Sequence, residues 1–200
     1  MAKIKLTKNE QKKQKDSLKR FQRYLPTLML KKQQLQAEIR QVDIRTSEVR
    51  ALKEQRDSVI SKWMAVYGEE GVFTTDILRI TKLVAGEGNV AGVSIPVFET
   101  AEFEVSNYDL AEKPLWLDLA VDNMKRALLL DMELQCLEEQ QRRLRKELQT
   151  TSQRVNLFEK IKIPEAEANI KKIAVYLGDQ QTAAVVRGKI SKRGMERAGS

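Results

Sequence analysis

Two segments of the chain carry apolar side chains at alternating spacings of three and four residues. One stripe runs through residues 18–63 and the other through residues 127–158. Such spacing is the heptad pattern of a coiled-coil seam. A seam needs a partner, so two seams in one chain predict that the segments pair with each other. The seam positions are Leu18, Phe21, Leu25, Leu28, Leu35, Ile39, Val42, Val49, Ile60 and Trp63, then Ala127, Leu130, Leu134, Leu137, Leu144, Leu148, Val155 and Phe158.

The first stripe has four polar positions on its lattice, namely Lys32, Thr46, Lys53 and Arg56. Long basic side chains can cover apolar surface with their stems while their charged ends reach water. Polar positions weaken a seam and help to fix its register. Because two of them fall close together, the seam is weakest around Lys53–Arg56, where we predict partner contact or torsional softness.

The first segment predicts one long helix. Thr7 is a candidate N-cap with Glu10 as its capping-box partner, and no glycine follows before Gly68. Pro26 removes a backbone donor, so a kink or short break is expected near Tyr24–Pro26.

The second segment predicts a helix from about Leu115, after Pro114, to Leu177. Pro164 interrupts it, and the apolar stripe changes phase there to Ala166, Ile170, Ile173 and Leu177. In an antiparallel pair Pro26 and Pro164 would lie at similar heights, which suggests a shared bend.

The middle of the chain changes character. Runs rich in branched residues at 78–84, 93–98 and 103–105 predict extended pieces, with a turn at 85–89. Pro96 cannot donate to a central ladder, so its strand is an edge or is interrupted there. A hairpin this small is not stable alone and should lean on the neighbouring helix ends or on a partner.

The sequence therefore predicts a mainly α fold. It is a long antiparallel left-handed two-helix coiled coil built from the N- and C-terminal segments, with a small insert containing a β-hairpin at the bend. We divide the chain into an N-terminal coiled-coil helix at 1–67, a middle module at 68–114, a C-terminal coiled-coil helix at 115–178 and a basic, partly flexible tail at 179–200.

The net charge of +8 is unevenly distributed. Residues 1–67 hold 17 basic and 7 acidic side chains, whereas residues 68–114 hold 3 basic and 9 acidic ones. Residues 115–200 hold 16 basic and 12 acidic side chains. The chain therefore combines basic helical segments with an acidic insert, an asymmetry that its function has to explain.

Catalytic chemistry is not indicated. The single cysteine, Cys136, allows no intrachain disulfide, and the chain has no histidine to activate it or to complete a zinc site. The Gly86-Glu87-Gly88 run lacks the Lys-Ser/Thr of a phosphate-binding loop and is better interpreted as a turn. No apolar run reaches the roughly 18 residues of a membrane span. We therefore expect a cytoplasmic protein without cofactor or metal, for which any link to a membrane must come through partners.

Three motifs give the chain a resemblance to a known family. They are the Leu28–Leu35 run, the Asn89–Glu99 segment with Gly92 and Pro96, and the Arg154-Val155-Asn156-Leu157-Phe158-Glu159 run followed by Pro164. In order and spacing they resemble the D subunit of V-type and A-type rotary ATPases, which is the central-stalk component. The family's proline before Thr7 is absent, and Gln153 stands in place of an arginine.

The resemblance implies a rotor axle that hydrolyses nothing itself. The paired terminal helices would enter the cavity of the hexamer of catalytic A and B subunits. The lower part would bind the F subunit of the stalk and the C/d-type cap subunit of the membrane ring. The basic tip of the helix pair would meet the inner wall of the hexamer, where acidic loops are expected to contact Lys12, Lys13, Lys19, Arg20, Arg187 and Lys189.

Two alternatives remain open from the sequence. The stalk of a type III secretion or flagellar export ATPase shares the helical-hairpin plan, but it lacks the Asn-Val-Ala-Gly-Val insert. A basic coiled-coil protein could also bind nucleic acid through the cations of its N-terminus. Only Phe21 and Tyr24 are aromatic there, and both lie close to the seam, which favours protein contact.

Overall fold

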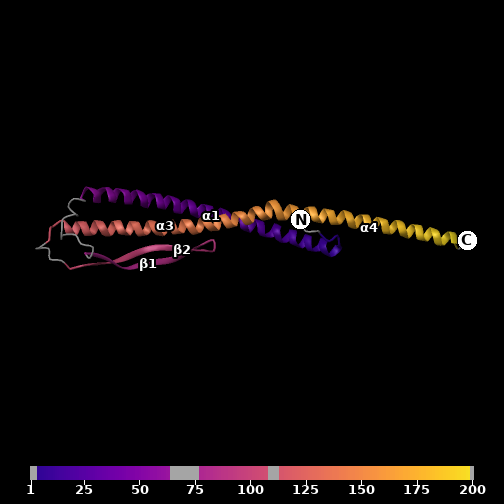
Figure 1. Cartoon of the computed structure of the whole chain (residues 1–200), viewed down its shortest axis with the longest axis horizontal. Coiled ribbons are helices and arrows are strands. Elements are labelled where there is room, and N and C mark those ends of the chain that lie inside the picture. Colours follow the sequence, from indigo (N-terminus) through magenta and orange to yellow (C-terminus); the bar gives the residue numbers. More distant parts are fainter. Residues whose placement is uncertain (1–3, 64–76, 108–112, 199–200) are drawn as a thin grey trace. The chain divides into compact units, whose positions relative to one another are not determined.

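The computed structural model describes residues 4–63, 77–107 and 113–198. Helix α1 spans Lys8–Lys62, and strands β1 (Leu78–Val90) and β2 (Val93–Val105) form an antiparallel hairpin. Helix α3 (Leu117–Leu157) continues through a π-helical turn, η1 (Phe158–Lys162), into α4 (Ile163–Ala198) (Figure 1). The predicted class, two long helices with a hairpin between them, is confirmed.

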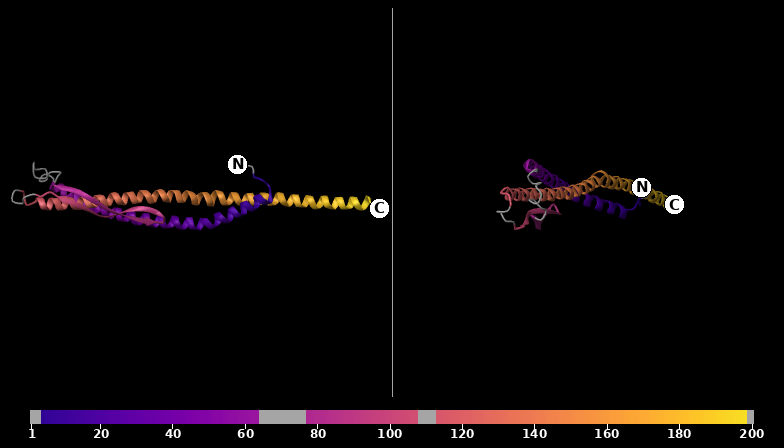
Figure 2. Two further views of the ribbon diagram at one scale, coloured as in Figure 1. Left: turned by 90° about the horizontal axis from the view of Figure 1, so that it is seen from below. Right: turned by 60° about the vertical axis from the view of Figure 1, so that its left-hand side comes forward.

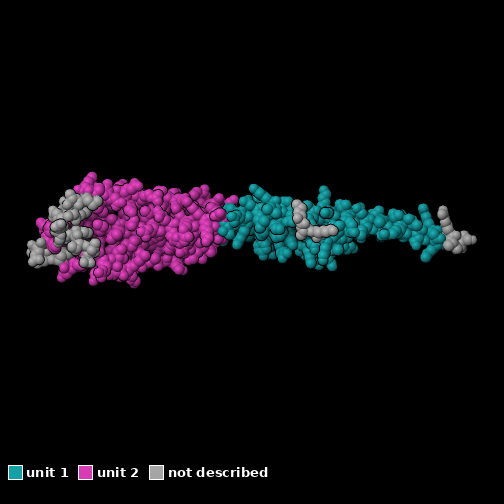
Figure 3. Space-filling view, viewed as in Figure 1, with its two compact units in different colours: residues 1–31, 150–200 teal, residues 32–149 magenta. Residues whose placement is uncertain are grey.

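The chain forms two compact units, each built from segments of both helical regions (Figure 3). Unit 1 contains residues 1–31 and 150–200, and unit 2 contains residues 32–149.

The start of α1 is capped as its sequence predicts. The backbone N–H of Glu10 donates to the Thr7 hydroxyl at 3.3 Å, and that of Gln11 donates to the Thr7 carbonyl at 3.0 Å. This satisfies donors that have no partner within the helix itself.

The short break expected near Tyr24–Pro26 is wrong, because α1 continues through Pro26; the kink that the sequence offered as the other outcome stays a prediction. Proline leaves the Gln22 carbonyl without its helical donor. Both residues are exposed, so water can serve that carbonyl, and the half-buried Leu25 and Leu28 hold the turn by packing.

Unit 2 has its core between α1, α3 and the hairpin. Leu35 and Val49 of α1 and Leu144 of α3 are fully buried. Their cluster also contains Ile39, Val42, Ile95 and Leu137, with Leu130, Leu134 and Leu148 packed against it. The hairpin thus contributes a residue of its own, Ile95 of β2, to the core made by the two stripes.

Polar pairs between the helices of unit 2 fix their antiparallel direction. Asp43 of α1 meets Arg145 of α3 at 3.1 Å, Lys53 pairs with Asp131, and Arg56 donates to the Asn123 side chain at 3.4 Å. Numbers rise along α1 as they fall along α3, which is the antiparallel order. Thr46, a polar lattice position, is buried and donates its hydroxyl to the Val42 carbonyl at 2.7 Å.

The hairpin turn lies later than the sequence predicted. Residues 85–89 belong to β1, and the chain reverses at Ala91 and Gly92, whose φ angles are +50° and +80°. Two positive φ values make a primed turn, which suits the twist of paired strands. The Asn89 side chain accepts a hydrogen bond from the Gly92 N–H at 3.0 Å and stabilises this turn. The glycines at 86 and 88 had favoured the wrong turn position.

The hairpin packs along the helix pair of unit 2, where the sequence predicted contact with helix ends (Figure 2). Register shifts fall between Ile80 and Lys82 and between Val84 and Ala85. From Val84 to Val90 side chains of β1 alternate between half-buried and exposed, whereas residues 79–83 are all exposed. The half of the hairpin beyond the bulges therefore packs on the core between the helices. At the other end of the hairpin, Leu78 and Val105 pack against Leu117 and Val121 of α3, so only the stretch 79–83 of β1 is exposed throughout.

Unit 1 pairs the start of α1 with the end of α3 and α4. The rings of Phe21 and Phe158 lie 5.2 Å apart, and Val155, Ala166 and Ile173 are buried. The phase change predicted at Pro164 coincides with η1, in which the Ile163 N–H donates to the Phe158 carbonyl. A π turn accommodates about one additional residue, which shifts the apolar stripe around the helix.

The tail expected to loosen after Gly178 is helical, because α4 extends to Ala198. Thr182 donates to the Gly178 carbonyl at 3.1 Å, and Gln180 donates to the Tyr176 hydroxyl at 2.9 Å. Every residue from Gly178 to Met195 is exposed. We call this segment, residues 178–195, the α4 extension; Figure 1 shows it continuing past the start of α1.

Candidate partner-binding surfaces

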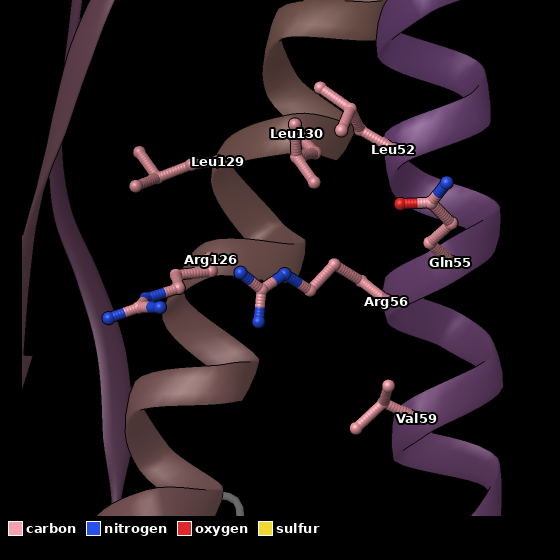
Figure 4. A pocket seen from close by; sticks show the side chains of 7 residues that line it. All are labelled: Leu52, Gln55, Arg56, Val59, Arg126, Leu129 and Leu130. Atoms are coloured by element: carbon pink, nitrogen blue, oxygen red, sulfur yellow. The ribbon is translucent and has the colours of Figure 1, made fainter.

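A groove lies between α1 and α3 within unit 2. It has a volume of about 470 Å³ and is lined by Leu52, Gln55, Arg56, Val59, Arg126, Leu129 and Leu130. Figure 4 shows Leu130 directed toward α1, and Leu129 on the other side of α3. Leu52 and Val59 lie one heptad apart and therefore on the same face of α1. Leu52 is 47 % exposed and Val59 is 39 % exposed, so this apolar face is not covered. We call this surface the seam groove.

The seam groove coincides with the weak part of the predicted seam. Arg56 reaches from α1 into the space between the helices (Figure 4), where it donates to the Asn123 amide oxygen. Lys53 beside it pairs with Asp131, whose hydrogen bond raises the lysine pKa. Polar side chains thus replace apolar contact here, and Leu52 and Val59 of α1 stay exposed to solvent.

Two seam positions at this end of α1 are poorly covered. Trp63 is 42 % exposed and Ile60 is half-buried. The buried part of the first stripe therefore ends at Val49. Residues 64–67, which the sequence assigned to the same helix, lie outside the described residues.

Three side chains of α3 hold the hairpin of unit 2. Gln140, which is 8 % exposed, donates to the Pro96 carbonyl at 2.6 Å, and the Cys136 thiol donates to the same oxygen at 3.4 Å. Arg143 donates to the Ser94 carbonyl at 3.1 Å. These carbonyls belong to the edge of β2, so α3 supplies the donors that another strand would supply in a wider sheet. Burial raises the pKa of the Cys136 thiol, which keeps it protonated as a donor.

The six cations predicted to form the tip are all exposed and all belong to unit 1. Lys12, Lys13, Lys19 and Arg20 lie in the first turns of α1, where Arg20 donates to the Ser17 hydroxyl at 3.2 Å. Arg187 and Lys189 lie on the α4 extension, which continues past the start of α1 (Figure 1). The two sets therefore occupy different stretches of unit 1.

The motif residues have local structural roles. Asn89 and Gly92 build the hairpin turn, and Pro96 offers the carbonyl that Gln140 binds. Val155 is buried one turn before η1, Glu159 lies within η1, and Pro164 follows it. Arg154 and Asn156 flank Val155 and are exposed.

Sequence reasoning missed the hydrogen bonds from Gln140, Cys136 and Arg143 to β2, which we call the hairpin clamp. Gln140 and Arg143 follow each other at a helical spacing of three, but in a polar run they resemble an ordinary solvated face. The available signal was Pro96. Proline has no backbone N–H to donate and is confined to edge strands, so a carbonyl on its free edge can accept a hydrogen bond from a neighbouring side chain. Leu129 and Leu52, which line the seam groove, lie off the strict seam lattice.

Two kinds of feature are absent from residues 4–63, 77–107 and 113–198, the ranges that the structure describes. No group of three or more His, Cys, Asp or Glu side chains is arranged there to hold a metal ion. In the same ranges, no helix has the length and apolarity that crossing a bilayer requires.

Comparison with known proteins decides the family. The sequence profile of the ATP synthase D subunit matches residues 10–193. That span includes both long helical regions and the hairpin between them.

The chain belongs to the ATP synthase D-subunit family.

Relatives from two groups of bacteria support the assignment. The V-type ATP synthase D subunit of Borreliella burgdorferi is 50 % identical over 196 residues, which cover 96 % of this chain and 95 % of the relative. Those of Chlamydia abortus and Chlamydia felis are 35 % and 34 % identical, and each covers 95 % of this chain and 92 % of the relative. The resemblance seen in the motifs is therefore confirmed, and it extends over nearly the whole length of these D-subunit relatives.

Proposed function

We propose that this chain is the non-catalytic central stalk subunit of a V/A-type rotary ATPase. In that role it transmits torque between the hexamer of catalytic A and B subunits and the membrane ring that moves ions. Membership of the D-subunit family supports the assembly, since the relatives are named as subunits of V-type ATP synthases.

The α4 extension is the observation that carries the proposal. It holds Val185, Val186 and Ile190 with about half or more of each side chain exposed, and three glycines within the helix. Each interior glycine costs a helix about 1 kcal/mol relative to alanine. A helix of this length without tertiary contacts is marginal in water. Its apolar side chains and its length suit insertion into a cavity of a partner, such as the centre of the A/B hexamer.

The exposed cations extend this contact surface. Arg187 and Lys189 on the extension, with Lys12, Lys13, Lys19 and Arg20 on α1, would face acidic loops of the hexamer wall. Because the stalk presents different side chains around its circumference, the three catalytic sites would become unequal, and rotation would move that inequality from site to site.

Unit 2 would hold the remaining stalk contacts. The seam groove offers the exposed Leu52 and Val59, together with Arg56, to the F subunit of the stalk. The C/d-type cap subunit would bind the same part of the chain, near the hairpin insert. The protein would then be cytoplasmic and attached to the membrane through the complex alone.

Reconstitution tests the proposal. The A/B hexamer is mixed with the full chain, and a bead attached to unit 2 is followed during ATP hydrolysis. The proposal predicts stepwise rotation of the bead and a stable complex on gel filtration. A hexamer that neither retains the chain nor turns the bead would rule the proposal out.

A truncation makes the test specific for the carrying observation. A variant that ends at Leu177 lacks the α4 extension but retains the buried residues of both units. It should fold, shown by an unchanged cooperative melt, and should bind the hexamer more weakly and slip during rotation. Equal binding and torque by this variant would remove the extension from the mechanism.

A further inference from the structure

Unit 1 holds a second groove, at its π turn. Its volume is about 1040 Å³, and one wall runs from Ile4 to Phe21 while the other runs from Lys160 to Asn169. Apolar lining residues include Ile4, Phe21 and Ile161, of which Ile161 is 54 % exposed. None of the five residues of η1 is buried. In a continuous two-helix seam, each helical turn buries at least one residue against the partner helix. The two helices are therefore less closely packed at η1, which leaves the groove between them.

The charges that line this groove are not balanced. Its two carboxylates are engaged, since Glu165 pairs with Lys162 at 3.2 Å and Glu10 accepts a hydrogen bond from Gln14 at 2.9 Å. Lys5, Lys13 and Lys160 are exposed and have no carboxylate within 4 Å among the described residues. The groove thus combines an apolar lining with three cations that nothing in the described chain neutralises.

We propose that this groove receives an acidic, amphipathic segment of a partner protein. Carboxylates of that segment pair with Lys5, Lys13 and Lys160, and an apolar side chain packs against Ile4 and Ile161. The inference rests on the proposed function, in which the partner is the A/B hexamer, and it names a surface apart from the α4 extension.

The lining favours a peptide over a nucleic acid. Single-stranded nucleic acids need exposed aromatic rings on which bases stack. Phe21 is the only aromatic residue of the lining, and its ring already stacks with Phe158 at 5.2 Å. The positive charge therefore has an apolar neighbour but no stacking platform.

Zero-length cross-linking identifies the segment directly. A carbodiimide joins a lysine amine to a carboxylate only when the two are in contact, and mass spectrometry then locates the joined peptides. In the complex of the full chain with the A/B hexamer, Lys13 and Lys160 are expected to be joined to Asp or Glu residues of a single hexamer segment. Cross-links that form elsewhere on the chain but never at these lysines or Lys5 would overturn the proposal.

Matched variants separate this groove from general attraction. Lys13→Glu/Lys160→Glu reverses two groove charges, and Arg40→Glu/Lys82→Glu makes the same change in net charge at exposed positions of unit 2. The groove variant should bind the hexamer about tenfold more weakly than the control variant, since like charges would face each other. Ser17→Trp fills the groove without changing charge and should also weaken binding, which excludes a purely long-range effect.

The outcomes distinguish this inference from the proposed function. If the wild-type chain does not bind the hexamer, the proposed function fails. If it binds and the groove variants bind as tightly as the controls, with unchanged melting temperatures, only the groove proposal fails. A single-stranded RNA that binds the wild-type chain near 150 mM salt, and loses binding in Lys13→Glu/Lys160→Glu, would assign the groove to nucleic acid and overturn the proposal.

Discussion

Helix α1 between Leu35 and Val49 and the α4 extension are both regular helices, but they are helical for different reasons. The first buries four apolar side chains against α3 and the hairpin. The second buries none of its side chains and contains glycines at 178, 188 and 194. Tertiary packing explains the helix in unit 2. No packing within the described chain explains it in the extension, which points to a partner that covers this segment.

The two regions are also expected to differ in their resistance to bending and shear. A helix pair with a buried seam and a docked hairpin resists bending and shear, because deformation would expose apolar surface. An uncovered helix resists them only through its own hydrogen bonds. We therefore expect stiffness to be intrinsic in unit 2 and to be supplied by the partner along the α4 extension.

The largest predicted effect is on the seam of unit 2. Leu137→Ala/Leu144→Ala should lower the free energy of unfolding by at least ~4 kcal/mol, since each buried leucine costs about 2–5 kcal/mol when truncated. Urea denaturation followed by circular dichroism measures this. Val185→Ala/Ile190→Ala on the α4 extension is the control and should change it by less than ~0.5 kcal/mol. A similar decrease in the free energy of unfolding for both double variants would contradict the proposed difference between the two regions.

Glycine replacement should act in the opposite sense on the extension. No heavy atom lies within 4 Å of a Cβ added at Gly178, Gly188 or Gly194. The triple alanine variant should therefore stabilise the extension's helix by about 2 kcal/mol, from ~0.5–1 kcal/mol per site. Slower amide exchange in residues 178–195, with unchanged exchange in residues 35–49, is the expected readout. Unchanged exchange in the extension would show that something other than glycine limits its helix.

The hairpin clamp has a smaller predicted effect. Gln140→Leu leaves the Pro96 carbonyl without its strongest donor, which costs about 1–3 kcal/mol. The hairpin should lift from α3 more often, and Cys136 beneath it should react about tenfold faster with a maleimide, by 1.4 kcal/mol per factor of ten. Gln149→Leu, at an exposed position of the same helix, should leave the rate unchanged. Equal rates in the two variants would mean that the Gln140 hydrogen bond does not hold the hairpin against α3.

The smallest predicted effect concerns pH. Hydrogen bonds from Arg142 and Arg143 lower the pKa of Glu139 from 4.5 to about 2. The stabilisation this gives is fully present above pH 4.5 and is lost as the pH falls through about 2. Carbon-13 NMR of the side-chain carboxyl should show a midpoint near 2, and Arg142→Gln/Arg143→Gln should move it toward 4.5. A midpoint near 4.5 in the wild type would show that these exposed pairs do not persist in solution.

The sequence predicts the parts of the fold that rest on periodicity. The seam spacing indicated two paired helices, and branched runs indicated the strands. The turn was misplaced, because three glycines compete in the hairpin and only the backbone at Ala91 and Gly92 selects one. The helical tail was missed for a related reason: glycine favours a helix end, whereas α4 continues through Gly178, Gly188 and Gly194 to Ala198.

The candidate surfaces were predictable in part. The weak seam at Lys53–Arg56 follows from polar residues on the lattice, and the seam groove lies there. The groove of unit 1 was not predictable, because it depends on the π turn that precedes Pro164 and on which lysines nearby lack carboxylate partners among the described residues. Both features depend on which residues lie close together in the folded chain, and the spacing of residues along the sequence does not reveal that.

Hydrogen exchange across residues 178–195, with and without the A/B hexamer, tests the central claim most directly. The account predicts that amides of the α4 extension exchange fast in the free chain and become strongly protected in the complex, while the amides of residues 35–49 are protected in both. Fast exchange of the extension in a complex that rotates, or equal protection of both regions in the free chain, would contradict it.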